Sequence, residues 1–331
     1  MAMDEFDALS PARRDALRAA LRAAFGAARV ESATPLAGGV SGAFPFRVEI
    51  GGRAYMARVE GVPSPLRNPH QYESLRIAAA AGLAPRVHHV DETSRVVVTD
   101  FIERRPLATF PGGPPALARA LGELLARLQT TDAFPHFVTY PAIVARLFAH
   151  VRRTGLFADG VLDPHVAHLE RITAAYDAGA PPRVSSHNDP TPGNVLFDGE
   201  RLWLIDWESA YRNDPLVDVA IALDTHGMGP ALAAELLLGW LGRAPDAATL
   251  DRLATVRALT RLYFAGVFLS GSAVAHGARG DSDLSAPTVA AFQHGRADRT
   301  FAPGAAWHVM GKMYLAAFLT GAEPPGLDAA E

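Results

Sequence analysis

The chain of 331 residues contains no cysteine. It can therefore form neither disulfides nor the cysteine-based zinc sites and nucleophiles that many proteins use. Lysine is almost as scarce, because Lys312 is the single one and every other strongly basic side chain is an arginine. A role that a lysine ordinarily fills elsewhere in a fold must therefore be filled by an arginine in this chain.

An excess of basic residues and long apolar runs are also missing. The 31 Lys and Arg residues are outnumbered by 35 Asp and Glu residues, which gives no sign of a basic surface for nucleic acid. No apolar run reaches the roughly 18 residues of a membrane span. Residues 1–26 are alanine-rich, with early acids and no signal-peptide core. We therefore expect no nucleic-acid partner, no membrane span and a cytoplasmic location.

The stretch from residue 184 to residue 218 combines strand-like runs with a turn signal. Residues 195–197 and 202–205 are apolar and rich in aromatic or branched side chains. Asp198-Gly199 falls between these runs, and this dipeptide favours the positive φ angles of a tight hairpin turn. The pattern therefore predicts a β-hairpin.

Polar side chains flank this hairpin on both sides. Asp189 and Asn194 precede it, and Asp206 follows it. The hairpin brings these three side chains to one end of a small sheet. Two carboxylates and an amide oxygen are hard ligands suited to Mg²⁺, and a carboxylate left over from metal binding can orient a hydroxyl nucleophile. Enzymes that transfer phosphoryl groups use this combination of a metal site and a nucleophile-orienting carboxylate.

Residues 30–62 predict a three-stranded antiparallel meander that contains a glycine-rich segment. The candidate phosphate-binding residues of this segment are Gly38, Gly39, Ser41 and Gly42. Glycines allow backbone N–H groups to approach phosphate oxygens closely. A plain hairpin turn would use the same residues, and that alternative stays open at this stage.

The remaining elements follow from periodicity. Strands are expected at 84–90 and 95–102. Helices are expected at 10–26, 70–81, 116–130, 143–153, 161–178, 229–241, 248–270 and 303–319, and a further helix begins near Asp214.

Two motifs in the 184–218 stretch resemble those of a known family. His187-Asn188-Asp189 with Asn194, followed by Ile205-Asp206, is similar to the catalytic and metal loops of protein-kinase-like phosphotransferases, where protein kinases read H-R-D and D-F-G. The sequence is most similar to the choline/ethanolamine kinase branch in two motifs, H-N-D-x-x-P-G-N-V-L and L-W-L-I-D-W-E. The aminoglycoside phosphotransferases are near relatives of that branch.

The resemblance implies an α+β, protein-kinase-like fold with two lobes. Residues 1–103 would form a small N-terminal lobe around a five-stranded antiparallel sheet, which binds nucleotide. Residues 104–331 would form a mostly helical catalytic and acceptor-binding lobe. ATP and Mg²⁺ are the implied cofactors, with Asp189 as the catalytic residue and Asn194 and Asp206 as metal ligands.

The resemblance also implies nucleotide contacts in the small lobe. Arg58 would grip the α- and β-phosphates in place of the kinase lysine, and Glu73 would pair with it from the following helix. Asp100 C=O and Ile102 N–H would bind the adenine edge. Asp218 would hold the catalytic loop through its backbone. From the residues alone, Arg58 could equally be a solvated surface arginine, and Glu73 an acid that stabilises a helix N-terminus.

The expected reaction is transfer of the ATP γ-phosphoryl group to a hydroxyl of a small molecule. By resemblance the acceptor is an amino alcohol such as choline or ethanolamine. Quaternary ammonium groups bind aromatic faces, so Trp207, Tyr211, Trp307 and the acid Glu208 are candidate acceptor ligands, although aromatics on apolar helices are more often core residues. Aminoglycoside, homoserine and sugar acceptors stay open, as does a nucleotide-binding pseudokinase scaffold.

Overall fold

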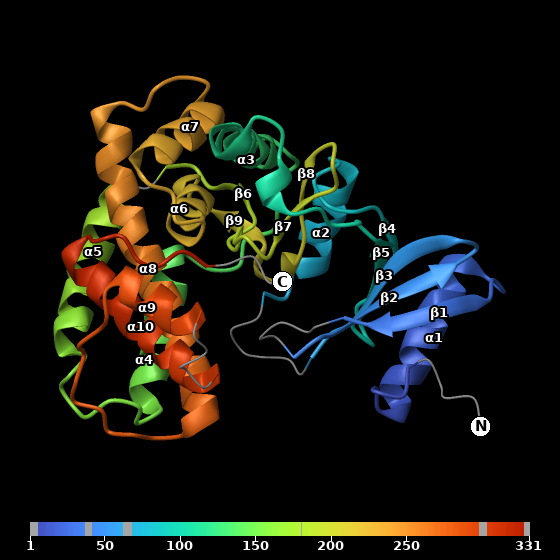
Figure 1. The fold of residues 1–331 in the computed structure, drawn as a ribbon, viewed down its shortest axis with the longest axis horizontal. Coiled ribbons are helices and arrows are strands. Elements are labelled where there is room, and N and C mark those ends of the chain that lie inside the picture. The colour runs from blue at the N-terminus through green and yellow to red at the C-terminus, as the bar shows by residue number, and fades with distance from the viewer. Residues whose placement is uncertain (1–5, 37–41, 62–67, 180, 298–302, 328–331) are drawn as a thin grey trace.

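The computed structural model describes residues 6–36, 42–61, 68–179, 181–297 and 303–327. A twisted sheet with one covering helix lies on one side, and a larger helical body lies on the other (Figure 1). This arrangement agrees with the expected two-lobed, mixed α+β fold. The position of the lobe boundary near residue 103 stays a prediction.

The small lobe contains one five-stranded antiparallel sheet in the order β1-β2-β3-β5-β4. Its strands are β1 (Val30–Pro35), β2 (Phe44–Ile50), β3 (Arg53–Val59), β4 (Val87–Asp91) and β5 (Val96–Asp100). The predicted meander of β1, β2 and β3 is confirmed. The last strand, β5, is inserted beside β3, so that β4 forms the edge.

The two faces of this sheet bury different helices. Val96 and Val98 pack in a cluster with Leu17 and Leu21 of α1 (Pro11–Phe25). Val97 points to the opposite face, as strand alternation requires, and belongs to the cluster of α2 (Gln71–Ala80) and the large lobe. Helix α1 therefore covers the outer face of the sheet, whereas α2 connects the sheet to the helical body.

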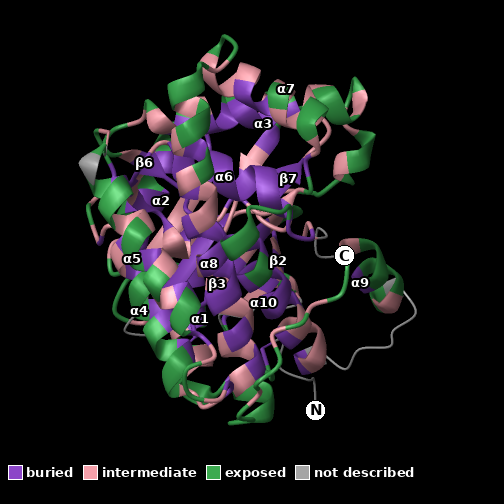
Figure 2. Cartoon of the chain, turned by 90° about the vertical axis from the view of Figure 1, so that its left-hand side faces the viewer, coloured by how far each residue is buried: buried purple, intermediate pink, exposed green. Residues whose placement is uncertain are grey.

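The large lobe is built from eight helices among the described residues. They are α3 (Gly113–Gln129), α4 (Tyr140–Arg153), α5 (Asp163–Ala178), α6 (Leu216–Thr225), α7 (Pro230–Leu241), α8 (Ala247–His276), α9 (Val289–Ala297) and α10 (Pro303–Thr320). Every residue of α6 is buried, and Figure 2 shows buried residues concentrated around α6 and α8. The sequence pattern did not predict α9.

Helix α8 is long and apolar enough, by length and composition, to cross a membrane. However, 56% of its apolar window is buried inside the molecule. It also carries Arg261, which is buried and ion-paired with Asp224 of α6. These contacts are those of a core helix.

Short strands at the junction of the lobes support the catalytic segment. They are β6 (Val184–Ser186), β7 (Val195–Phe197), β8 (Leu202–Leu204) and β9 (Tyr211–Asn213), and two short 3₁₀ helices lie at η1 (Leu107–Thr109) and η2 (Trp207–Ser209). Strands β7 and β8 pair antiparallel, which confirms the predicted hairpin.

The hairpin loop is wider than the Asp198-Gly199 signal predicted, because it spans residues 198–201. The Asp198 carboxylate accepts hydrogen bonds from the N–H groups of Glu200 and Arg201, both at 2.8 Å. These local bonds stabilise the longer loop, a behaviour typical of Asp in turns.

Candidate active site

The loop after β6 is held in place from beneath by Asp218. This residue lies fully buried in the first turn of α6. Its two carboxylate oxygens accept the backbone N–H groups of His187 and Asn188, at 2.8 and 2.7 Å. The structure thus shows the contact that the resemblance implied for Asp218.

Asn188 ties this loop to the segment after β8. It adopts a left-handed conformation with φ 62°, which Asn tolerates better than most residues. Its amide nitrogen donates to the carbonyl of Ser209 at 2.8 Å, and its amide oxygen accepts from Asn213 at 2.7 Å. The loop conformation is therefore fixed by side-chain bonds on both sides.

His187 supports the loop from within the core. Its ring meets Trp207 edge to face with centroids 4.7 Å apart, and its Nε2 bonds to the carbonyl of Ile205 at 2.9 Å. Burial lowers the pKa of His187 to about 4. It is neutral at pH 7, which suits packing rather than proton transfer.

Asp189 and Asn194 lie side by side, as the hairpin predicted. The Asn194 amide nitrogen donates to Asp189 Oδ2 at 2.8 Å and to the Asp189 carbonyl at 3.0 Å. Burial and the nearby charges of Asp206 and Glu208 raise the pKa of Asp189 well above its usual value. Asp189, Asp206 and Glu208 therefore lie within electrostatic reach of one another.

Asp206 begins the segment after β8 in a left-handed conformation, with φ 63°. Such backbone strain in a residue other than glycine is typical of functional sites. Its Oδ1 contacts Nη1 of Arg58 at 2.7 Å, and Glu208 contacts Nη2 of the same guanidinium at 3.0 Å. Arg58 of β3 thus joins the sheet to the catalytic segment of the large lobe.

The predicted pair of Glu73 with Arg58 is wrong. Arg58 contacts Glu60 through Nε at 3.3 Å, besides Asp206 and Glu208, whereas Glu73 is exposed. The reason is the orientation of α2 about its axis, which decides which of its residues face the protein interior. Its buried face carries Tyr72, Leu75 and Ala78, so helical spacing turns Glu73 to the solvent side together with Arg76.

The donor set of this site fits Mg²⁺. Asn194 donates through its nitrogen, which leaves its amide oxygen as a metal ligand, and Asp206 supplies a carboxylate. Within the described part of the chain, three carboxylates contact the Arg58 guanidinium, and carboxylates attract a divalent cation. Among the described residues, no three or more His, Asp or Glu side chains form a metal cage of their own. Mg²⁺ bound with substrate phosphates needs only one or two protein carboxylates.

The other predicted nucleotide residues belong to the loop before β2 and to the end of β5 with the segment that follows it. Gly42 is exposed with φ 67°, and Gly38, Gly39 and Ser41 lie outside the described residues. Asp100 closes β5, and its carboxylate bonds to His88 at 2.7 Å. Ile102 follows in the half-buried link to the large lobe.

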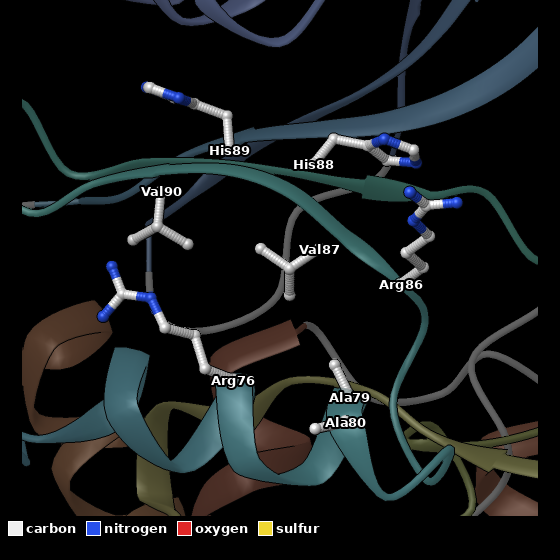
Figure 3. A pocket seen from close by; sticks show the side chains of 8 residues that line it. All are labelled: Arg76, Ala79, Ala80, Arg86, Val87, His88, His89 and Val90. Carbon is white, nitrogen blue, oxygen red and sulfur yellow. The ribbon is translucent and has the colours of Figure 1, made fainter.

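A groove of about 530 Å³ lies between α2 and β4 (Figure 3). Two of its basic side chains are already paired, Arg76 with Glu92 at 2.8 Å and His88 with Asp100 at 2.7 Å. Its lining includes none of the catalytic-segment residues. It is therefore not part of the candidate active site.

The predicted acceptor tryptophans occupy packed positions. Trp207 is 5% exposed and donates to the Leu204 carbonyl at 3.1 Å. Trp307 of α10 packs against Gly271 of α8, where an added Cβ would lie 2.7 Å from its ring. Gly271 is eight residues beyond Tyr263, or roughly 12 Å along the helix. These contacts favour structural roles for both tryptophans.

Tyrosines gather near Asp189 instead. Tyr263 of α8 lies 5.9 Å from Tyr140, between ring centroids, and Tyr211 meets Phe137 at 5.6 Å. Burial, followed by the charges of Asp189 and Glu208, raises the pKa of Tyr263. Sequence reasoning singled out Tyr211, but it passed over Tyr140 because nothing in an apolar helix start distinguishes a site residue from a core residue.

Comparisons with known proteins identify the family and the fold. The model of the family described as "Phosphotransferase enzyme family" (APH) matches residues 32–254. Protein LicA of Haemophilus influenzae is 42% identical over 52 residues, which is 16% of this chain and 19% of that relative. The local match thus spans about a fifth of the relative's length.

Two solved structures share the fold over nearly the whole chain. A choline/ethanolamine kinase family protein from Mesorhizobium loti has a TM-score of 0.65 and 25% identity, over 91% of this chain and 99% of that one. A thermostable mutant of aminoglycoside phosphotransferase APH(4)-Ia, in a ternary complex with AMP-PNP and hygromycin B, has a TM-score of 0.60 and 19% identity, over 91% and 98%. The chain belongs to the phosphotransferase enzyme family, has its kinase-like fold and is a small-molecule kinase.

Proposed function

We propose that this enzyme transfers the γ-phosphoryl group of ATP to the hydroxyl of a small cationic amino alcohol such as choline or ethanolamine. The observation that carries the proposal is the shared site of Asp189, Glu208 and Tyr263. There, a carboxylate suited to phosphoryl transfer lies within electrostatic reach of a second carboxylate and a half-buried tyrosine.

The nucleotide would bind between the lobes. Asn194 and Asp206 would hold Mg²⁺, which bridges the phosphates and neutralises their charge when bound. Arg58 would contact the α- and β-phosphates, since a guanidinium binds phosphate oxygens bidentately. The backbone of Asp100 and Ile102 would bind adenine. The complex of the APH(4)-Ia neighbour with AMP-PNP supports a nucleotide site in this fold.

The glycine-rich segment would cover the phosphates. Its proposed members are Gly38, Gly39, Ser41 and Gly42. Of these, Gly42 has a positive φ of 67°, a conformation that glycine adopts without steric cost. Backbone N–H groups in such a segment can point at phosphate oxygens.

Asp189 would act on the acceptor hydroxyl. Its Oδ2 is fixed by the Asn194 amide at 2.8 Å, so its other oxygen can accept the hydroxyl proton as the O–P bond forms and the ADP oxygen leaves. Positioning and charge neutralisation supply most of the acceleration in this reaction class. The carboxylate is therefore chiefly an orienting group that takes the proton late.

The acceptor cation would lie against the half-buried Tyr263, with Glu208, which also contacts Arg58, supplying negative charge. Tyr140 is buried and packs against the Tyr263 ring, so it would support that ring rather than touch the acceptor. Cations are attracted to aromatic faces within about 6 Å of the ring centroid. The alternative, a polycationic aminoglycoside, has the support of the APH(4)-Ia neighbour. It would need several unpaired acids around the cleft.

Two acids that could serve a polycation are already engaged. Asp214 is buried and ion-paired with Arg252. Asp281 is paired with Lys312 at 2.7 Å and with His308 at 2.9 Å. Because these two carboxylates already have cationic partners, a single small cation is the better match.

An acceptor panel tests the proposal. Choline, ethanolamine, aminoglycosides, homoserine and sugars are each incubated with ATP, Mg²⁺ and enzyme, and acceptor-dependent ADP release is measured. We expect turnover with an amino alcohol, and a loss of roughly 10²- to 10⁴-fold in Asp189→Asn, in the range of general-base catalysis. Asp163→Asn, at an exposed carboxylate, serves as the matched control.

Three outcomes would count against the proposal. Preferential turnover of an aminoglycoside would replace the acceptor class. Activity of Asp189→Asn within a few-fold of the parent would remove Asp189 from its role. Nucleotide binding without transfer to any acceptor on the panel would favour the scaffold alternative.

A further inference from the structure

The guanidinium of Arg58 contacts carboxylates from both lobes. Nη1 and Nη2 reach Asp206 and Glu208 of the large lobe at 2.7 and 3.0 Å. Nε contacts Glu60, which directly follows β3, at 3.3 Å. We propose that Glu60 is the positioning residue of Arg58 and takes the role that the family resemblance gave to Glu73. The inference rests on the proposed phosphate-binding role of Arg58.

The backbone places Glu60 on the same side as Arg58. Strand β3 ends at Val59, but the N–H of Glu60 still donates to the Arg95 carbonyl at 2.9 Å, so the ladder continues. In an extended chain, side chains two positions apart lie on one face. Glu60 is only 4% exposed. Its carboxylate is thus a buried anion beside the stem of the guanidinium.

Nucleotide binding is expected to change the contacts of Arg58 with Asp206 and Glu208 but to leave its contact with Glu60 in place. Asp206 is a proposed Mg²⁺ ligand, and a carboxylate that binds the metal is no longer available to Nη1. Asp206 and Glu208 also belong to the large lobe, so any change of lobe spacing alters their distance to β3. Glu60 is on the same chain segment as Arg58 and keeps its contact in either case.

The atom that Glu60 contacts matters as well. Bidentate phosphate binding uses parallel N–H groups of the guanidinium. The Glu60 carboxylate lies at Nε as an ion pair rather than a hydrogen bond, so it attracts the guanidinium from the β3 side and leaves Nη1 and Nη2 to exchange carboxylates for phosphate oxygens. Without Glu60, the attraction of Asp206 and Glu208 would draw Arg58 toward the large lobe and away from the phosphates.

Nucleotide affinity tests this inference without knowledge of the acceptor. Calorimetric titration with Mg·ADP and Mg·AMP-PNP is carried out on the full-length parent and on Glu60→Gln, which keeps the shape and removes the charge. We expect a loss of affinity on the order of tenfold, or about 1.4 kcal/mol. Glu73→Gln distinguishes the helix acid from Glu60 and is expected to bind within twofold of the parent.

A double-mutant cycle shows whether Glu60 acts through Arg58. In an Arg58→Met background, Glu60→Gln should change the affinity by less than twofold, because coupled residues are not additive. Glu92→Gln, which removes a carboxylate from the exposed Arg76 pair, is the unchanged control. Glu60→Asp keeps the charge on a shorter side chain and should lie between parent and Glu60→Gln, which provides a second variant if Glu60→Gln does not fold.

Unchanged or tighter nucleotide binding by Glu60→Gln would overturn the inference. So would a loss of nucleotide affinity in Glu73→Gln that exceeds the loss in Glu60→Gln, or an effect of Glu60→Gln that is as large in the Arg58→Met background as in the parent. These results are distinct from a failure of the proposed function, which appears as an absence of phosphoryl transfer by a parent enzyme that still binds nucleotide. A parent that binds no Mg·nucleotide would overturn both.

Discussion

At the scale of single residues, carboxylates gather around the Arg58 guanidinium in the described part of the active site. Arg58 contacts Asp206, Glu208 and Glu60, and Asp189 lies near the same carboxylates, which raise its pKa. The attraction of a divalent cation to Asp206 is the physical basis on which we propose a Mg²⁺-dependent nucleotide site.

Asp206→Asn should lose the Mg²⁺ dependence of nucleotide binding. The amide cannot supply the negative charge that attracts the metal, whereas Arg58 keeps Glu60 and Glu208 as partners. We expect ADP affinity in Mg²⁺ to fall by on the order of tenfold, about 1.4 kcal/mol, and to differ little from the affinity in EDTA. Isothermal titration with and without EDTA measures this, and a retained Mg²⁺ response would exclude Asp206 as a ligand.

At the scale of elements, the catalytic loop depends on the first turn of α6. Asp218 accepts the N–H groups of His187 and Asn188 with its two oxygens. Burial, partly offset by these two bonds, raises the pKa of Asp218 to about 6. An unfolded aspartate titrates near 4. The folded protein therefore binds the extra proton between about pH 4 and 6, and through this window Asp218 makes the free energy of unfolding fall as pH rises.

Activity should follow the opposite trend through the same window. Below pH 6, protonation converts one Asp218 oxygen into a donor, which frees a loop N–H, so we expect kcat to fall as pH decreases. Asp218→Asn can accept only one of the two bonds and should lower kcat roughly 10- to 100-fold, since misplacing reacting groups by about 1 Å can cost 100-fold. A kcat–pH profile of parent and variant checks this, and the variant should lack the step near pH 6. An unchanged profile would refute the role.

At the scale of the whole molecule, buried ion pairs connect the helices of the large lobe. Asp224 of α6 pairs with Arg261 at 2.9 Å and with Arg257, both of α8. Arg261 also reaches the Ala317 carbonyl of α10 at 3.5 Å. Because three helices meet at this charge cluster, its loss should affect global stability rather than one local segment.

Asp224→Asn should destabilise the fold by about 3–5 kcal/mol, as expected when one partner of a buried ion pair is removed and its charged partners stay buried. Glu235→Gln removes the more exposed pair with Arg119 and should cost less than about 1 kcal/mol. Urea unfolding followed by circular dichroism measures both. Equal effects would mean that the buried cluster contributes no more than a surface pair.

The sequence determined the strands of the small lobe, most helices and the catalytic hairpin, because these follow from local periodicity and short-range turn chemistry, whereas the short strands β6 and β9 were not predicted. It also placed Asp189 beside Asn194, since only a few residues and one hairpin separate them from Asp206. The tertiary structure alone decided which carboxylates surround Arg58 and which tyrosines approach Asp189. Those contacts join β3 to the segment after β8, and α4 to α8, across long stretches of chain. They depend on helix register and packing, which is why Glu73 faces solvent while Glu60, two residues beyond Arg58, reaches its guanidinium.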